Sequence, residues 1–221
     1  VMQWLASAGG SNVTIDESAT NKMSLTVGSL DIGHGLGGDT SNVAVGFGAL
    51  DESLAGTANC TAIGKSALGE LKYPSQDNTA IGHAALDALV GHAAGATGED
   101  NTAVGSYSLS KTVDGGRNTA VGRSALHDGD CADDNTALGY KALYVFTGSN
   151  ATAVGSGAVA AASSAAGITA VGKSALAIVT GEYNTAVGHN AGLVITSGNN
   201  NVAVGALALD ATLIGYQNTA V

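Results

Sequence analysis

The chain has 221 residues, a formal net charge of −10 at pH 7 and only 12% charged residues, while 45% are hydrophobic and 33 are glycine. Disordered chains combine low hydrophobicity with high charge, and collagen needs glycine at every third position with abundant proline, so both classes are excluded. The excess of acidic residues argues against nucleic acid or an anionic membrane surface as partner. The sequence contains no run of about 18 strongly apolar residues, so membrane insertion is not expected.

Residues 1–22 differ from the rest of the chain. Gln3–Ala6, a turn at Gly9-Gly10 and Val13–Ile15 are interpreted as a hairpin. We expect this segment to form an N-terminal cap on a second region, residues 23–221. Because the chain begins at Val1 with neither an initiator methionine nor a positively charged leader, we expect a fragment or a processed product.

A pattern of about 17 residues repeats through region 23–221. The consensus of the copies is Asn-Thr-Ala-Val-Gly-x-x-Ala-Leu. Asn101–Leu109, for example, matches it at every position except the second alanine. A worn copy, Leu25–Leu30, comes first, and a partial copy, Asn218–Val221, comes last. The copies between them are marked by Gly46, Gly64, Gly82, Gly105, Gly122, Gly139, Gly155, Gly172, Gly188 and Gly205, 16 to 18 residues apart except for one interval of 23. Such a period predicts a solenoid with one coil per copy.

The first strand of each coil is predicted at Thr-Ala-Val, where residues i and i+2 share one face. The branched residues at these positions, such as Thr119 and Val121, are expected to point into the coil. The residue between them is alanine in every copy, which indicates an outward column packed closely against another backbone. This column comprises Ala44, Ala62, Ala80, Ala103, Ala120, Ala137, Ala153, Ala170, Ala186 and Ala203, with Ala220 in the partial copy.

The end of each copy, x-Ala-Leu, is expected to form a second strand whose leucine fills the coil, as at Leu109 and Leu126. The glycine between the two strands supplies backbone freedom for a turn. Asparagine heads eight of the eleven copies, which predicts a left-handed turn position at the asparagine and a ladder of hydrogen-bonded asparagine side chains.

These columns predict an all-β parallel solenoid of about eleven coils, on the order of 50 Å long at about 4.8 Å per coil. A helical interpretation is disfavoured: Ala84–Ala96 has room for a short helix, but helical repeats have periods of about 33 residues or more. The partial copy at the end indicates that the solenoid either continues beyond residue 221 or stacks on another subunit.

Two segments carry a family resemblance. Ser41–Gly46 and Asn200–Gly205 resemble the Asn-Ser-Val-Ala-Ile-Gly motif in the heads of YadA-like trimeric autotransporter adhesins. The fuller copies, preceded by Asp31–Gly38, are more similar to repeats of phage tail-fibre and related viral structural proteins. The resemblance covers about residues 23–221 and implies a left-handed parallel β-roll and three parallel chains, with the small alanine column packed at the trimer axis. The repeat is longer than that of the adhesins, and attachment and assembly modules are expected outside this chain.

No catalytic, cofactor-binding or metal-binding site is expected. The histidines, His34, His83, His92, His127 and His189, lack metal-ligand spacing and are interpreted as surface residues. The acidic residues before the asparagine column are Asp39, Asp77, Glu99, Asp100, Asp133, Asp134 and Glu182. Without the Gly-Gly-x-Gly-x-Asp pattern, a solvated polar edge is favoured over a calcium ladder. The eight basic residues form no cluster with them.

Two further residue types are informative. Cys60 and Cys131 lie four coils apart and cannot bridge within one chain, so free thiols are expected, with a bond between chains as the alternative. Asn12, Asn59 and Asn150 match the N-glycosylation acceptor, which matters only in a host that glycosylates exported proteins.

The sequence therefore predicts a non-catalytic structural or adhesive fibre segment, extracellular or on a virion surface. It would be a rigid shaft or receptor-binding part of a viral tail fibre or surface adhesin, assembled as a homotrimer. A host receptor or glycan would contact the insertion between Gly82 and Gly105 and the region of Tyr140, Tyr144 and Phe146.

Two alternatives stay open. One is an extracellular filament whose subunits stack head to tail, a contact that does not close. The other is an ice-binding solenoid, which needs the Thr and Val columns to face outward. Val and Ile in the paired column, with alanine left to fill the core, weigh against it.

Overall fold

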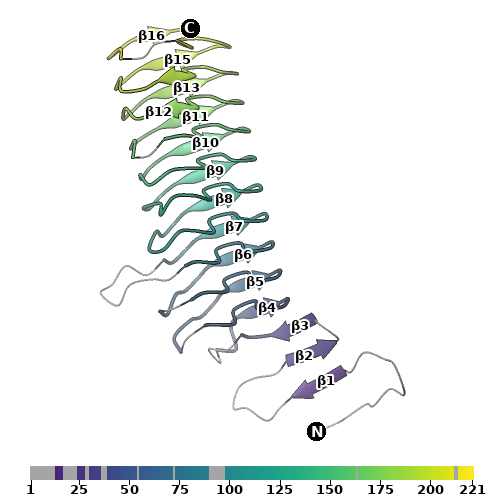
Figure 1. Cartoon of the computed structure of the whole chain (residues 1–221). Helices are drawn as coiled ribbons and strands as arrows, with labels where there is room; N and C mark the ends of the chain where they lie inside the picture. The colour runs from purple at the N-terminus through teal and green to yellow at the C-terminus, as the bar shows by residue number, and fades with distance from the viewer. Residues whose placement is uncertain are drawn as a thin grey trace.

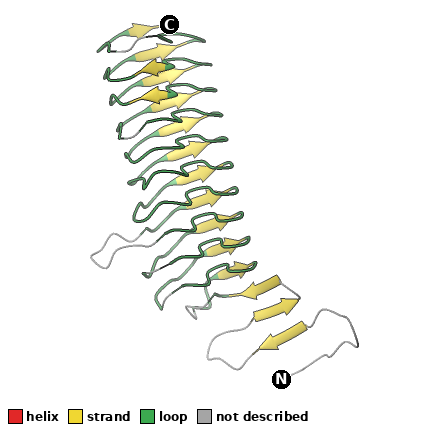
Figure 2. Ribbon diagram, in the orientation of Figure 1, coloured by secondary structure: helices red, strands yellow, loops and turns green. Residues whose placement is uncertain are grey.

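The structure, a computed structural model, describes residues 13–16, 24–27, 30–35, 39–53, 55–71, 73–89, 98–162, 164–211 and 214–221. These residues form a rod of stacked coils (Figure 1). Each coil contributes a short strand to one sheet that runs along the rod, with tight turns at one end of the strands and longer loops at the other (Figure 2). The described residues contain strands and no helix, which confirms the predicted all-β parallel solenoid.

The long sheet has fourteen strands, and those from β4 onward are parallel and in register. Thr119 pairs with Thr136 and Ala120 with Ala137, so like positions stack along the rod. The parallel strands are β4 (Val43–Val45), β5 (Thr61–Ile63), β6 (Thr79–Ile81), β7 (Thr102–Val104), β8 (Thr119–Val121), β9 (Thr136–Leu138), β10 (Thr152–Val154), β11 (Thr169–Val171), β13 (Thr185–Val187), β15 (Val202–Val204) and β16 (Thr219–Ala220). A separate sheet pairs β12 (Ile178–Val179) with β14 (Val194–Ile195).

The N-terminal part of the sheet has a different topology. The strands β1 (Val13–Asp16), β2 (Ser24–Val27) and β3 (Leu30–Gly33) pair antiparallel in sequence order, and β3 pairs antiparallel with β4. The worn copy at Leu25–Leu30 is therefore not a coil, and the repeats begin at β4. The strand at Val13–Ile15 is confirmed within β1, whereas Gln3–Ala6 and the predicted Gly9-Gly10 turn lie outside the described residues.

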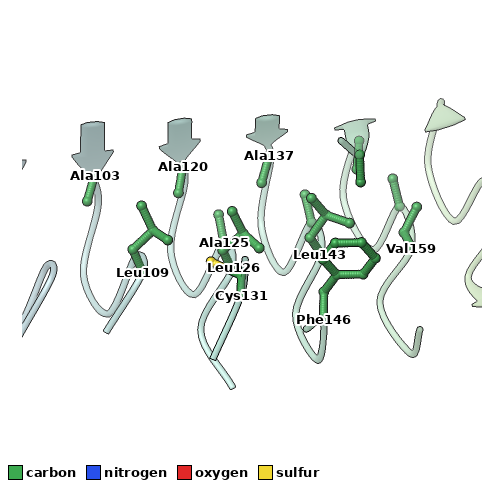
Figure 3. Packing of buried hydrophobic residues seen from close by; sticks show 14 of the residues in the cluster. Ala103, Leu109, Ala120, Ala125, Leu126, Cys131, Ala137, Leu143, Phe146 and Val159 are labelled. Atoms are coloured by element: carbon green, nitrogen blue, oxygen red, sulfur yellow. The ribbon is translucent and has the colours of Figure 1, made fainter. Parts of the chain in front are cut away.

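The alanine column points into the coil, so the predicted assignment of the two strand faces is wrong. From Ala62 to Ala203 every alanine of the column is 0% exposed within a single chain, and Ala44 is 6% exposed. Figure 3 shows Ala103, Ala120 and Ala137 directed toward the side of the coil that holds Leu109 and Leu126. The leucines occupy the interior, which leaves room only for a methyl group on the facing strand.

The Ala-Leu segment is a tight turn rather than the predicted second strand. Leu126 has φ +48° and Leu143 has φ +51°, in the left-handed region that branched residues rarely adopt. Burial of the side chain and the Leu126 N–H···O Ala142 hydrogen bond, 3.0 Å long, hold this conformation. The predicted leucine filling of the coil is confirmed, since Leu126 and Leu143 are 0% exposed.

The turn requires glycine at the end of the strand. Gly122 has φ +132°, and a Cβ added there would lie 2.6 Å from the carbonyl oxygen of Gly139 in the next coil. Any side chain would therefore both strain the backbone and separate the coils. This explains why the glycine column marks every copy.

The asparagine column forms a ladder inside the rod, but most of its bonds join a side-chain oxygen to the backbone N–H of the next asparagine. Among the described residues, the predicted bonds between side chains occur only at Asn184–Asn201 and Asn201–Asn218. Asn101 Oδ1 accepts the N–H of Asn118 at 2.9 Å, and Asn118 Oδ1 accepts the N–H of Asn135 at the same distance. These asparagines are 0% exposed. The left-handed residue, however, is the one before each asparagine of the column from Asn78 onward, such as Asp100 with φ +59° and Arg117 with φ +56°. The predicted turn position was wrong by one residue.

Candidate interaction surface

One side of the rod carries two outward columns of Thr and branched apolar residues, which we call the Thr-Val face. Its first column is Val43, Thr61, Thr79, Thr102, Thr119, Thr136, Thr152, Thr169, Thr185 and Val202; its second is Val45, Ile63, Ile81, Val104, Val121, Leu138, Val154, Val171, Val187 and Val204. The seven of these apolar residues that are most exposed have 37 to 47% of their surface accessible. Ten strands at about 4.8 Å spacing make the face about 43 Å long.

The in-register pairing of these strands gives the face its regularity. Thr152 stacks on Thr169, and Val154 stacks on Val171, so both columns run straight along the rod. Neither column contains a charged residue. A long uncharged face with exposed branched apolar side chains beside threonines is a candidate binding surface.

The two ends of the strands carry opposite charges. The column directly after the turn glycine includes exposed Lys65, Arg123 and Lys173, which we call the basic edge, and it contains no acidic residue. The two positions before the asparagine column hold Asp77, Glu99, Asp100, Asp133, Asp134 and Glu182, which we call the acidic edge. The Thr-Val face lies between these two edges.

Arg117 is the one cation within the acidic edge. Its guanidinium contacts Asp133 and Asp134 of the next coil, each at 2.8 Å. The hydrogen bond from Arg117 lowers the pKa of the Asp134 carboxyl. Because these groups are largely exposed, the ion pairs neutralise charge locally more than they stabilise the fold.

A ladder of ring contacts crosses four coils beside the tight turns. His83 contacts Tyr107 edge-on at 4.9 Å between ring centroids, Tyr107 contacts His127 at 5.8 Å, and His127 stacks on Tyr144 at 5.4 Å. Lys141 Nζ lies 4.7 Å from the Tyr144 centroid. Partial burial lowers the pKa of His127. Sequence reasoning missed this ladder because its rings occupy different positions of the repeat.

The residues that were expected to contact a receptor differ in exposure. Tyr140 is 47% exposed and Tyr144 is partly exposed, whereas Phe146 is 0% exposed and fills the coil. The expectation that Phe146 makes external contacts is therefore wrong. Residues 90–97 of the segment between Gly82 and Gly105 lie outside the described residues.

The histidines and acids do not converge on a site. His34 Nδ1 lies 2.6 Å from the carbonyl oxygen of Asn42, while His83 and His189 are exposed and His92 lies outside the described residues. Within the described part of the chain, no three His, Cys, Asp or Glu residues are grouped as metal ligands would be.

The cysteines and glycosylation acceptors have opposite environments. Cys60 and Cys131 are free and buried within the single chain, with 0% and 2% exposure, which weighs against the alternative of a disulfide between chains. Burial raises the pKa of the Cys131 thiol to about 11. Asn59 and Asn150 are exposed at loop positions, and Asn12 lies outside the described residues.

Comparison with protein-family models, curated proteins and solved structures gave no match to this chain. Across the described residues there is also no helix of the length and apolarity needed to cross a membrane. The candidate function therefore depends on the Thr-Val face and its edges.

Proposed function

We propose that the chain is a non-catalytic fibre segment, a rigid shaft that assembles with further copies of itself through the Thr-Val face. The observation that carries this proposal is the outward orientation of both branched columns along ten consecutive strands. Association removes this apolar surface from water, which is the main favourable term in protein assembly. This surface replaces the alanine column as the proposed contact between chains.

The interior of the rod supports a mechanical role. Backbone hydrogen bonds join each coil to the next, and the buried asparagine ladder adds a second row of bonds between coils. Each coil therefore contacts only its neighbours, as in other solenoids, and stiffness accumulates along the axis. The proposal includes an extracellular or virion-surface location, left-handed winding and a homotrimer, as the resemblance to tail-fibre repeats implies.

The test is the mass of the purified chain in solution, measured by sedimentation. We expect an oligomer at micromolar concentration, and Leu138→Lys with Val171→Lys should convert it to a monomer, because these residues are 47% and 37% exposed on the face. The matched control is Val145→Lys with Ile178→Lys, which are 38% and 46% exposed outside the long sheet. A monomeric wild-type chain, or equal effects of both pairs, would contradict the proposal.

Ice binding is the second candidate, and the same observation favours it. Outward Thr and Val columns with alanine in the core are the arrangement that an ice-binding solenoid needs, and the expected inward orientation that opposed it is absent. Thermal hysteresis of the monomeric chain, abolished by Thr119→Lys on the face and retained by Ile178→Lys, would support ice binding. Freezing that the protein leaves unchanged would eliminate ice binding.

The head-to-tail filament is a separate alternative. Electron microscopy of the purified chain distinguishes rods of fixed length from such a filament.

A further inference from the structure

We propose that the charged edges make the copies pack in parallel, with the basic edge of one copy against the acidic edge of the next. This inference rests on the proposed self-association through the Thr-Val face. The partner is a second copy of this chain, and the pairs are Lys65 with Asp77 and Lys173 with Glu182. These edges determine orientation, while the Thr-Val face supplies the contact area.

Arg117 contacts Asp133 and Asp134 within the chain, whereas the four charges of the proposed pairs have no ion-pair partner among the described residues. Among the described residues, the ion pairs involve Lys111, Arg117 and His127, and none involves Lys65, Lys173, Asp77 or Glu182. The basic column lies six or seven positions after the acidic positions of the same coil, which corresponds to about 20 Å or more of extended chain. A cation on one edge therefore cannot reach an anion on the other edge of the same face.

Symmetry determines which edges meet when two faces pack together. If copies are related by rotation about an axis that lies between the rods and parallel to them, as in a parallel dimer or trimer, the C-terminal strand ends of one copy lie beside the N-terminal strand ends of the next. Basic and acidic edges then meet. If the rods run in opposite directions, each edge meets its own copy, and like charges oppose each other at a cost in free energy.

The axial positions of the charges also match. Lys65 follows β5, and Asp77 precedes β6; Lys173 follows β11, and Glu182 precedes β13. In both cases the acid lies one coil further along the rod, about 4.8 Å, which a long lysine side chain spans. Arg123 has the same relation to Asp134, but Arg117 already contacts that carboxylate. His83 is left out because Asp87 lies near it.

The test reverses each edge separately and then both together. Lys65→Glu with Lys173→Glu, and separately Asp77→Lys with Glu182→Lys, should each weaken association by roughly tenfold or more at low ionic strength, and less at high salt. The variant with all four substitutions restores opposite charges and should assemble like the wild type. Its net charge equals that of the wild type, and the two single-edge variants shift net charge in opposite directions, so a net-charge effect is excluded.

Orientation is measured with a spin label at Phe47→Cys, which is 63% exposed in the first parallel coil. Cys60 and Cys131 are buried and stay unlabelled. Parallel packing places the labels at the same end, whereas antiparallel packing separates them by about 40 Å along the rod. An antiparallel oligomer, or one that neither single-edge variant weakens, overturns this inference and leaves the proposed function intact. A monomeric wild-type chain overturns both.

Discussion

Replacing Asn101 by alanine should cost about 2 to 6 kcal/mol of unfolding free energy. Asn101 is 0% exposed. Its Oδ1 accepts the N–H of Asn118 at 2.9 Å, and its Nδ2 donates to the carbonyl oxygen of Gly115 at 2.8 Å. Alanine removes both bonds and leaves two buried backbone groups without these partners, at about 1 to 3 kcal/mol each. The Asn101 N–H keeps its bond to Asn78 Oδ1, so that group adds nothing to the loss.

Urea unfolding followed by circular dichroism measures this loss, with Gln76→Ala as the control because Gln76 carries a similar amide on an exposed side chain. The control should stay within about 0.5 kcal/mol of the wild type. Since solenoids do not always unfold in one step, hydrogen exchange of the Asn118 amide provides a local measurement. If Asn101→Ala matches the control and Asn118 exchange is unchanged, the ladder does not stabilise the rod.

Two further predictions concern the interior of the coil. Ala120→Leu overfills a fully buried position and should destabilise the chain by about 1 to 3 kcal/mol in urea unfolding. The control, Thr119→Ala on the outward face, should change stability by less than about 0.5 kcal/mol. A larger loss for Thr119→Ala than for Ala120→Leu would contradict the assigned faces. Because burial raises the pKa of Cys131 from 9.0 to about 11, the stability due to its protonated thiol is complete below pH 9 and falls by about 2 to 3 kcal/mol toward pH 11. The Cys131→Ala variant should lack this decrease in the free energy of unfolding. A pH dependence identical to that of the wild type would contradict the assignment to Cys131.

Much of the solenoid could be predicted from the repeat. The strands at Thr-Ala-Val, the leucine core and the asparagine ladder all follow from columns that recur at one period, because stacked coils place like residues together. The turn at Ala-Leu could not be predicted, since leucine strongly disfavours the left-handed conformation that it adopts at Leu126. There, burial of the side chain overrides the local preference of the backbone.

The residues of the Thr-Val face could be grouped from the sequence, but their outward orientation could not be predicted. Alternation along a strand separates Thr119 and Val121 from Ala120 without saying which side is inside. Hydrophobicity favours the valine, and the structure selects the alanine because Leu109 and Leu126 already fill the interior. The ring ladder from His83 to Tyr144 was also beyond prediction, since its contacts join different positions of successive copies.

The amino-acid sequence by itself determined the period, the parallel stacking and the position of the Thr-Ala-Val strand in each copy, because a repeated pattern allows each coil only one way to match its neighbours. Only the tertiary structure decided which columns face outward and which loops carry charge beside them. That decision depends on the volume available between the strand and the turn of the same coil, where alanine and leucine fit together and two branched side chains do not. The Thr-Val face and its charged edges follow from that packing.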